Sequence, residues 1–145
     1  MTPRELSSIL LRVEKPARYV GGEYNMPDMD KPCRHRTCLC FSDKYEVGMS
    51  NIGVRILYHM LNDMEGFICE RSFAPDLDMA QELKSRGQRL FSLETKRDIV
   101  DFDLIGFSVQ FELQYTNIPY MFDLAGIPLY AKDRPEDFPP VVAGG

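Results

Sequence analysis

Three of the four cysteines lie close together, in the spacing Cys33-x-His35-x-x-Cys38-x-Cys40. Soft sulfur and imidazole ligands at short spacing could bind zinc or an iron–sulfur cluster. The alternative is structural, because residues 37–41 form a continuous apolar run that is typical of a strand buried on both faces. Cys38 and Cys40 are two residues apart, so on a strand they point to one face and pack as small apolar side chains. We favour packing, and we predict no metal site.

A second set of polar and small residues follows the predicted strands. Its members are Asp43, Tyr45, Gly48, Ser108, Gln110, Gly144 and Gly145. Glycines leave room for a ligand, and hydroxyl and amide groups supply hydrogen bonds to it. Ligands bind at the carboxyl ends of the strands in parallel α/β sheets. We therefore expect these residues to form one cofactor-binding site and to include no catalytic residue.

Strands and helices alternate along the chain. Apolar runs predict strands at residues 37–41, 67–71, 104–109 and 141–143. Apolar residues at helical spacing predict helices at residues 2–13, 52–61, 74–86 and 113–124. The connections include an extended arm at 16–32, a loop at 42–48, an extended piece at 90–93 and a candidate short strand at 127–130.

This order of elements predicts the fold class. Parallel strands joined by helices need right-handed crossovers that place helices on both faces of the sheet. We expect a three-layer α/β fold, Rossmann-like or flavodoxin-like. Its predicted parts are an N-terminal helix and arm at residues 1–35 and an α/β domain at 36–145. Because the last strand ends on Gly144-Gly145 without a following helix, we also expect a fragment of a longer protein, truncated at the C-terminal edge of its sheet.

Composition excludes several classes of function. The 145 residues have a net charge of −5, which disfavours non-specific nucleic-acid binding. No apolar run approaches the ~20 residues of a membrane span, and no signal-peptide pattern is present, so we expect no membrane association and a reducing cytoplasm. Only two histidines are present, which disfavours histidine-rich metal sites and a Ser-His-Asp hydrolase. Neither the Gly-x-x-x-x-Gly-Lys-Ser/Thr nor the Gly-x-Gly-x-x-Gly phosphate-binding pattern occurs, which disfavours a nucleoside triphosphatase and a typical dinucleotide dehydrogenase.

The residues at the strand ends resemble the Asp-x-His-x-x-Gly, Ser-x-Leu and Gly-Gly signature of cobalamin-binding domains. The resemblance implies that Ser108 and the final glycines make room for the nucleotide tail of the corrin. Tyr45 stands where that family has its cobalt-ligating histidine, and Gln110 replaces the leucine of Ser-x-Leu. A phenol with a pKa near 10 is a poor cobalt ligand. The expectation is therefore cobalamin bound without histidine ligation.

A closer resemblance covers nearly the whole chain, from about Arg18 to Gly145. Its strings are RYVGGEYN at 18–25, YEVGMS at 45–50, DFDLIGFS at 101–108 and YTNI at 115–118. These strings resemble the N-terminal region of cobalamin-domain-containing radical S-adenosylmethionine (radical SAM) proteins of uncharacterised role. The Cys-x-x-x-Cys-x-x-Cys motif of the radical domain is absent here. The resemblance therefore implies that S-adenosylmethionine and a 4Fe–4S cluster bind in a catalytic domain beyond residue 145.

Two functions follow from this resemblance. In the first, the chain is a cobalamin-binding N-terminal domain of a radical SAM enzyme and is not itself catalytic. In the second, the domain is degenerate, binds no cofactor and serves as an interaction or lid module. The radical SAM domain of the same protein is the expected partner in both. The arm around residues 19–25 packs either across the sheet edge or against that domain.

Overall fold

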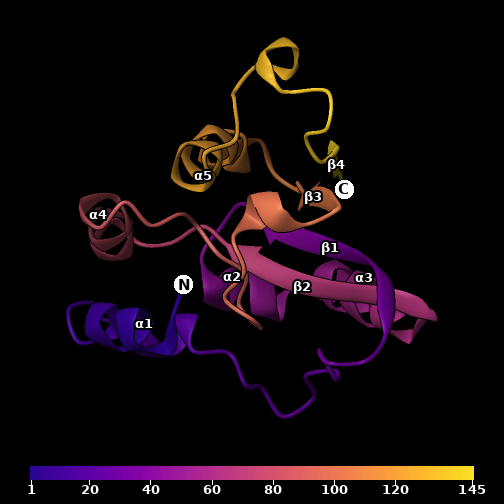
Figure 1. The fold of residues 1–145 in the computed structure, drawn as a ribbon, viewed down its shortest axis with the longest axis horizontal. Helices are drawn as coiled ribbons and strands as arrows, with labels where there is room; N and C mark the ends of the chain where they lie inside the picture. Colours follow the sequence, from indigo (N-terminus) through magenta and orange to yellow (C-terminus); the bar gives the residue numbers. More distant parts are fainter.

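The computed structural model describes all residues, 1–145, as an α/β fold built on a parallel sheet (Figure 1). Four strands lie in the order β2-β1-β3-β4. Their bounds are β1 Cys33–Phe41, β2 Gly66–Phe73, β3 Leu104–Ser108 and β4 Val141–Gly144. Every adjacent pair is parallel, so the predicted fold class is confirmed.

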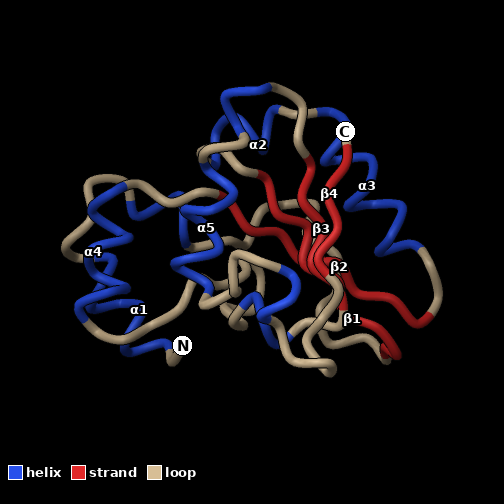
Figure 2. Tube along the Cα trace, turned by 90° about the horizontal axis from the view of Figure 1, so that it is seen from above, coloured by secondary structure: helices blue, strands red, loops and turns tan.

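Helices cover the sheet unequally (Figure 2). Helices α1 Pro3–Leu10, α4 Leu77–Ser85 and α5 Asn117–Ala125 lie to one side of the strands, and α3 Ile52–Asp63 lies on the other. The larger apolar core, which includes Cys38, Cys40, Ile105 and Phe107, forms on the three-helix side. A smaller core lies under α3. None of these helices is long and apolar enough to cross a membrane.

Local sequence explains where most helices begin and end. Thr2 caps α1 in a capping box with Glu5, and the Asn51 side chain accepts a hydrogen bond from the Val54 backbone N–H at the start of α3. Helix α5 ends at Gly126, whose φ of 73° is the left-handed conformation that glycine adopts readily. The predicted starts and ends of α1 and α3 agree with the structure to within about three residues.

Four local predictions were wrong. The predicted loop at 42–48 contains the start of a short helix, α2 Tyr45–Ser50. The segment predicted as one helix at 113–124 contains a 3-10 turn, Glu112–Gln114, followed by α5, and residues 115–116 separate the two. Residues 127–130 do not form a strand. The arm is not extended throughout, since Pro16–Tyr19 forms a 3-10 turn.

Candidate functional site

A groove lies beside α3 over the carboxyl half of β3 and β4, with a volume of about 460 Å³. Four predicted site residues line it, namely Ser108, Gln110, Gly144 and Gly145. Leu39 from β1 and Gly106 from β3 lie at its floor, while Ile56 and Leu57 of α3 and Val142 of β4 form apolar walls. The structure thus brings together the predicted residues that follow β3 and β4.

The register of the sheet explains this grouping. Gly106 pairs with Leu39 on one side and Val142 on the other, and Ser108 pairs with Phe41 and Gly144. Alternate residues of a strand point to the same face, so Gly106 and Ser108 share the face that α3 covers only in part. The polar and small side of β3 therefore faces the groove, while Ile105 and Phe107 face the larger core.

Two glycines of the groove, Gly106 and Gly144, are not required by the chain's own packing, whereas a Cβ on Gly145 would clash with the Val109 carbonyl oxygen. A Cβ added to Gly144 would meet no atom within 4 Å, and one added to Gly106 would meet only Val142 Cγ2, at 3.9 Å. Neither residue has a positive φ. Glycine inside a strand weakens it, and it often marks a close approach by a ligand or another backbone. The groove therefore has space that nothing in this chain fills.

Two side-chain amides close one end of the groove. The Asn51 amide donates to Gln110 Oε1 at 2.8 Å, and the Gln110 amide donates back to Asn51 Oδ1 at 3.3 Å. The Gln110 backbone N–H also donates to the buried Gln114 side chain, at 2.9 Å. These bonds fix the segment after β3 against the beginning of α3, which holds the two walls of the groove at a set separation.

The predicted residues of the first loop lie outside the groove. The Tyr45 hydroxyl donates to Glu23 at 3.0 Å, and its ring packs edge-on against Phe73 with the ring centroids 5.5 Å apart. Burial raises the pKa of Tyr45, and the hydrogen bond to Glu23 raises it further. Asp43 contributes to a separate shallow pocket, in which its carboxylate accepts the Lys44 backbone N–H at 2.7 Å.

Gly48 has a packing role that the sequence prediction did not anticipate. It is buried in α2, and an added Cβ would lie 2.2 Å from the Phe73 ring and 3.1 Å from the Phe41 ring. No real Cβ atom approaches ring carbons so closely, so glycine lets α2 sit directly on the ends of β1 and β2. Gly48 is therefore fully occupied by contacts within the chain.

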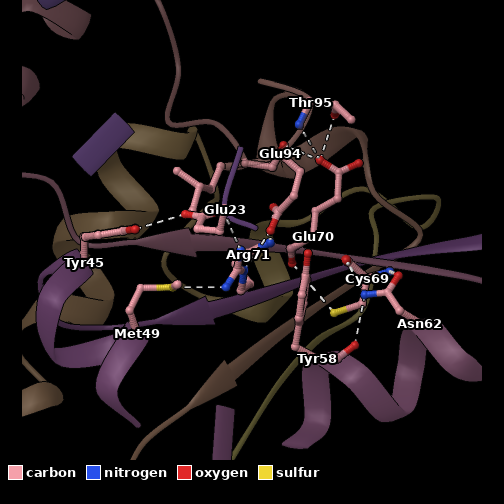
Figure 3. A network of polar contacts seen from close by, with 12 residues as sticks. Glu23, Tyr45, Met49, Tyr58, Asn62, Cys69, Glu70, Arg71, Glu94 and Thr95 are labelled. Carbon is pink, nitrogen blue, oxygen red and sulfur yellow. Dashed lines mark hydrogen bonds and ion pairs between the residues drawn. The ribbon is translucent and has the colours of Figure 1, made fainter. Parts of the chain in front are cut away.

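A buried polar network holds the arm on the carboxyl ends of β1 and β2, which we call the closed half of the sheet's carboxyl edge (Figure 3). Arg71 of β2, only 4% exposed, donates from Nε to Glu94 at 2.7 Å and from its guanidinium to Glu23 at 3.1 Å. Its guanidinium also stacks 4.1 Å from the centroid of the Tyr58 ring. Burial opposes the charge on Arg71, but the Glu94 carboxylate more than compensates, and the pKa of Arg71 is raised.

Glu70, the neighbour of Arg71 on β2, is fully buried and forms a second polar centre. Its carboxylate accepts hydrogen bonds from Ser92 at 2.7 Å and from the Thr95 hydroxyl at 2.7 Å, and it pairs with Arg36 at 3.2 Å. Neither network was predicted from the sequence. The available signal was the pair of charges at 70–71 inside a predicted parallel strand, where a charge must find a partner.

The arm packs across the sheet edge, which settles one of the two expectations for it. Arg18 is buried and pairs with Glu46 of α2 at 2.8 Å and with Asp76 at the start of α4. The Asp76 backbone N–H donates to the Tyr19 hydroxyl at 3.1 Å. The Lys96 ammonium donates to the Val20 carbonyl at 2.8 Å. The arm thus covers the carboxyl ends of β1 and β2.

The cysteine cluster packs as predicted. Cys38 and Cys40 lie side by side with their sulfur atoms 3.7 Å apart, and both are fully buried. Burial raises the pKa of the Cys38 thiol, and its contact with Cys40 raises it further, which keeps the thiol protonated. No group of three or more His, Cys, Asp or Glu side chains is placed to hold a metal ion. The cysteines of this chain therefore do not fit an iron–sulfur cluster.

Comparison with known families gives one match. The family described as "Radical SAM proteins, N-terminal" matches residues 53–145, which is more than half of the chain. The match includes all of α3 except its first residue, strands β3 and β4, and the segment after β3. No curated protein and no solved structure matched the chain. The chain thus belongs to the family of N-terminal regions of radical SAM proteins.

Proposed function

We propose that this N-terminal region of a radical SAM protein holds a cobalamin-type corrinoid by its nucleotide tail, in the groove beside α3. The observation that supports this most directly is the unfilled space above Gly106 and Gly144. Two strand glycines weaken a sheet without any benefit to the chain's own packing. An elongated tail lying along the sheet would use the space that they leave.

The residues around the groove fit such a tail. The Ser108 side chain can donate and accept hydrogen bonds at the floor, and Gly145 lies at the carboxyl end of the same groove. Leu57 and Val142 provide apolar walls that exclude water from a flat aromatic base. The Asn51–Gln110 amide pair fixes the separation of α3 and β3, so the groove is formed before a ligand enters.

No histidine lines the groove, and Tyr45 and His59 both lie outside it. Tyr45 is held by Glu23 and Phe73 outside the groove, and its raised pKa keeps the phenol protonated. His59, on the outer side of α3, lines a different shallow pocket. A bound corrinoid supplies a cobalt centre for methyl transfer or radical chemistry. The role of this chain is to anchor and orient it.

The test is retention of hydroxocobalamin by the purified chain after desalting, followed by its visible absorbance. We expect retained corrinoid in the wild type and at least tenfold weaker binding in Gly144→Val, because the valine side chain fills the groove. Ala143→Val is the matched control, since it lies on the same strand but faces the opposite side of the sheet. Absence of corrinoid from the wild type, or equal binding by both variants, contradicts the proposal.

The closed first loop favours a second candidate function. In cobalamin domains the loop after the first strand approaches the corrin. Here that segment forms α2, which packs on the strand ends through Gly48 and is bonded to the arm through Tyr45 and Glu23. In this candidate the fold binds no cofactor and acts as a lid or interaction module for the radical SAM domain. A wild-type chain that retains no hydroxocobalamin, yet unfolds cooperatively, supports this second function over the first.

A further inference from the structure

The Arg71 guanidinium has two carboxylate partners, and the chain holds them with different firmness. Glu94 accepts hydrogen bonds from both the backbone N–H and the Nε of Arg71, each at 2.7 Å, and its side chain is inaccessible to solvent. Glu23 comes from the arm and accepts one bond from Arg71, at 3.1 Å, and its side chain is 22% exposed. Because Glu94 already pairs the buried guanidinium, Glu23 is a second anion at one cation.

Tyr45 joins Arg71 in binding the Glu23 carboxylate (Figure 3). The Tyr45 hydroxyl donates to one carboxylate oxygen at 3.0 Å, and Arg71 donates to the other. Arg71 lies near the carboxyl end of β2 and Tyr45 begins α2. This edge is where ligands bind in parallel α/β sheets. A carboxylate from another molecule would meet the same two donors at the same place.

A small cavity lies next to this pair of donors, and Tyr45 lines it. Its volume is about 20 Å³, which is room for about one water molecule. Most of the lining is apolar and includes Phe73 and Phe91, while Arg18 and Tyr19 of the arm form part of its wall. Two hydrogen-bond donors for a carboxylate therefore adjoin an apolar cavity, and movement of the arm would enlarge that cavity.

The arm is attached at this point by polar contacts more than by apolar packing. Val20 is 52% exposed and Tyr24 is fully exposed, so release of this segment would transfer little apolar surface to water. Gly21 and Gly22, which precede Glu23, both have positive φ, of 72° and 79°. Glycine adopts positive and negative φ about equally well, so this pair can serve as a hinge.

We propose that Arg71 and Tyr45 form a second binding site, for a small carboxylate that carries an apolar group of a few carbon atoms, and that Glu23 occupies this site in the absence of the ligand. The ligand carboxylate replaces that of Glu23 on the two donors, and its apolar group enters the cavity. The exchange leaves the charge beside Arg71 unchanged, because one carboxylate replaces another and Glu23 returns to water. The site is separate from the groove at β3 and β4, so the inference does not rest on corrinoid binding.

The test is a titration of the purified chain with isovalerate, followed by the heteronuclear NMR signals of the Arg71 Nε–H and the Gly22 backbone N–H. Isovaleramide, which has the same shape without the charge, is the matched ligand. We expect isovalerate to shift both signals and isovaleramide to shift neither. Glu23→Gln removes the competing charge, and we expect this variant to bind isovalerate at least about tenfold more tightly than the wild type.

Two further variants separate competition by Glu23 from a purely structural role. Asp30→Asn removes the same charge from an exposed position of the same arm, and it should bind isovalerate as the wild type does. Glu23→Asp keeps the charge but is one methylene shorter, so it should hold the two donors less well and also bind isovalerate more tightly. This second variant keeps the test decisive if Glu23→Gln does not fold.

Three results would each overturn the inference. The first is that isovalerate leaves the Arg71 signal unchanged in every one of these proteins. The second is that the wild type and the folded Glu23 variants have equal affinity for isovalerate. The third is that isovaleramide produces the same shifts as isovalerate. Because no corrinoid is present in these titrations, failure of cobalamin binding and failure of carboxylate binding are separate results.

Discussion

The two halves of the sheet's carboxyl edge differ in what fills them. At β1 and β2, the arm, α2 and the Arg71 network occupy the edge, and Gly48 leaves no space for a methyl group. At β3 and β4, Gly106 and Gly144 face open space. The same sheet therefore has one half filled by its own chain and one half with space that its own residues leave open. Sequence motifs at strand ends do not distinguish these two situations.

The largest expected effect concerns the closed half. Replacing Arg71 with Met leaves the Glu94 carboxylate buried without its cation, and Glu94 is inaccessible to solvent. We expect the free energy of unfolding, measured by urea denaturation, to fall by about 3–5 kcal/mol. The control is Arg12→Ala. It removes the ion pair between the exposed Arg12 side chain and Glu82, whose charged atoms are 3.8 Å apart, and it should cost less than about 0.5 kcal/mol. Equal losses in the two variants would show that the network does not hold the closed half.

The second prediction compares the two kinds of glycine directly. Gly48→Ala forces a methyl group against the Phe73 ring, and we expect it to lower the free energy of unfolding by about 1–3 kcal/mol. Gly144→Ala adds a methyl group to open space, so its effect should stay within about 0.5 kcal/mol. Both are measured by urea denaturation in the absence of ligand. A larger loss in Gly144→Ala than in Gly48→Ala would remove the distinction between the two halves.

The sequence predicted the fold and the grouping of residues at β3 and β4, but not the contacts at β1 and β2. The alternation of apolar runs and helical spacing predicted the parallel sheet, and the strand ends placed Ser108 and Gly144 in one groove. Those features depend on local pattern and on the general topology of α/β folds. The contacts of Tyr45 were not predictable in this way, because its partner Glu23 lies 22 residues earlier, in an arm without helical or strand periodicity.

Buried charged residues were the second feature that the sequence did not predict. The predicted second strand, residues 67–71, ended on the charged residues Glu70 and Arg71, whereas the structure extends it to Phe73 and buries both charges inside it. Charged residues are almost never fully buried unless they are paired. Their partners Ser92, Glu94 and Thr95 come from the segment after α4, and a single sequence does not show that this segment folds back onto β2.

The smallest expected effect is a pH dependence from the contact between the arm and α2. Partial burial acts to raise the pKa of Glu46, but its hydrogen bond and ion pair with Arg18 outweigh this, and the pKa lies below the ordinary value of 4.5. A carboxyl group whose pKa is lower in the folded state stabilises the fold above its unfolded pKa. That contribution is lost as the pH falls through the folded pKa. Glu46→Gln should therefore be less stable than the wild type near neutral pH and equally stable in acid.

Because the Glu46 side chain is 52% exposed, solvent screens its pair with Arg18, and the difference at about pH 7 should be only about 0.2–1 kcal/mol. Urea denaturation of both proteins at about pH 7 and about pH 2 compares the ionised and the protonated Glu46 side chain. Glu65→Gln, at an exposed acid before β2 that forms no ion pair, should match the wild type at both values. Carboxyl groups far from Arg18, such as Glu5 in the capping box, are unaffected by the substitution and cancel in the difference. A difference that persists unchanged in acid would show that Glu46 acts through packing, and that the arm is held on the closed half by Arg71 and Lys96 without help from this ion pair.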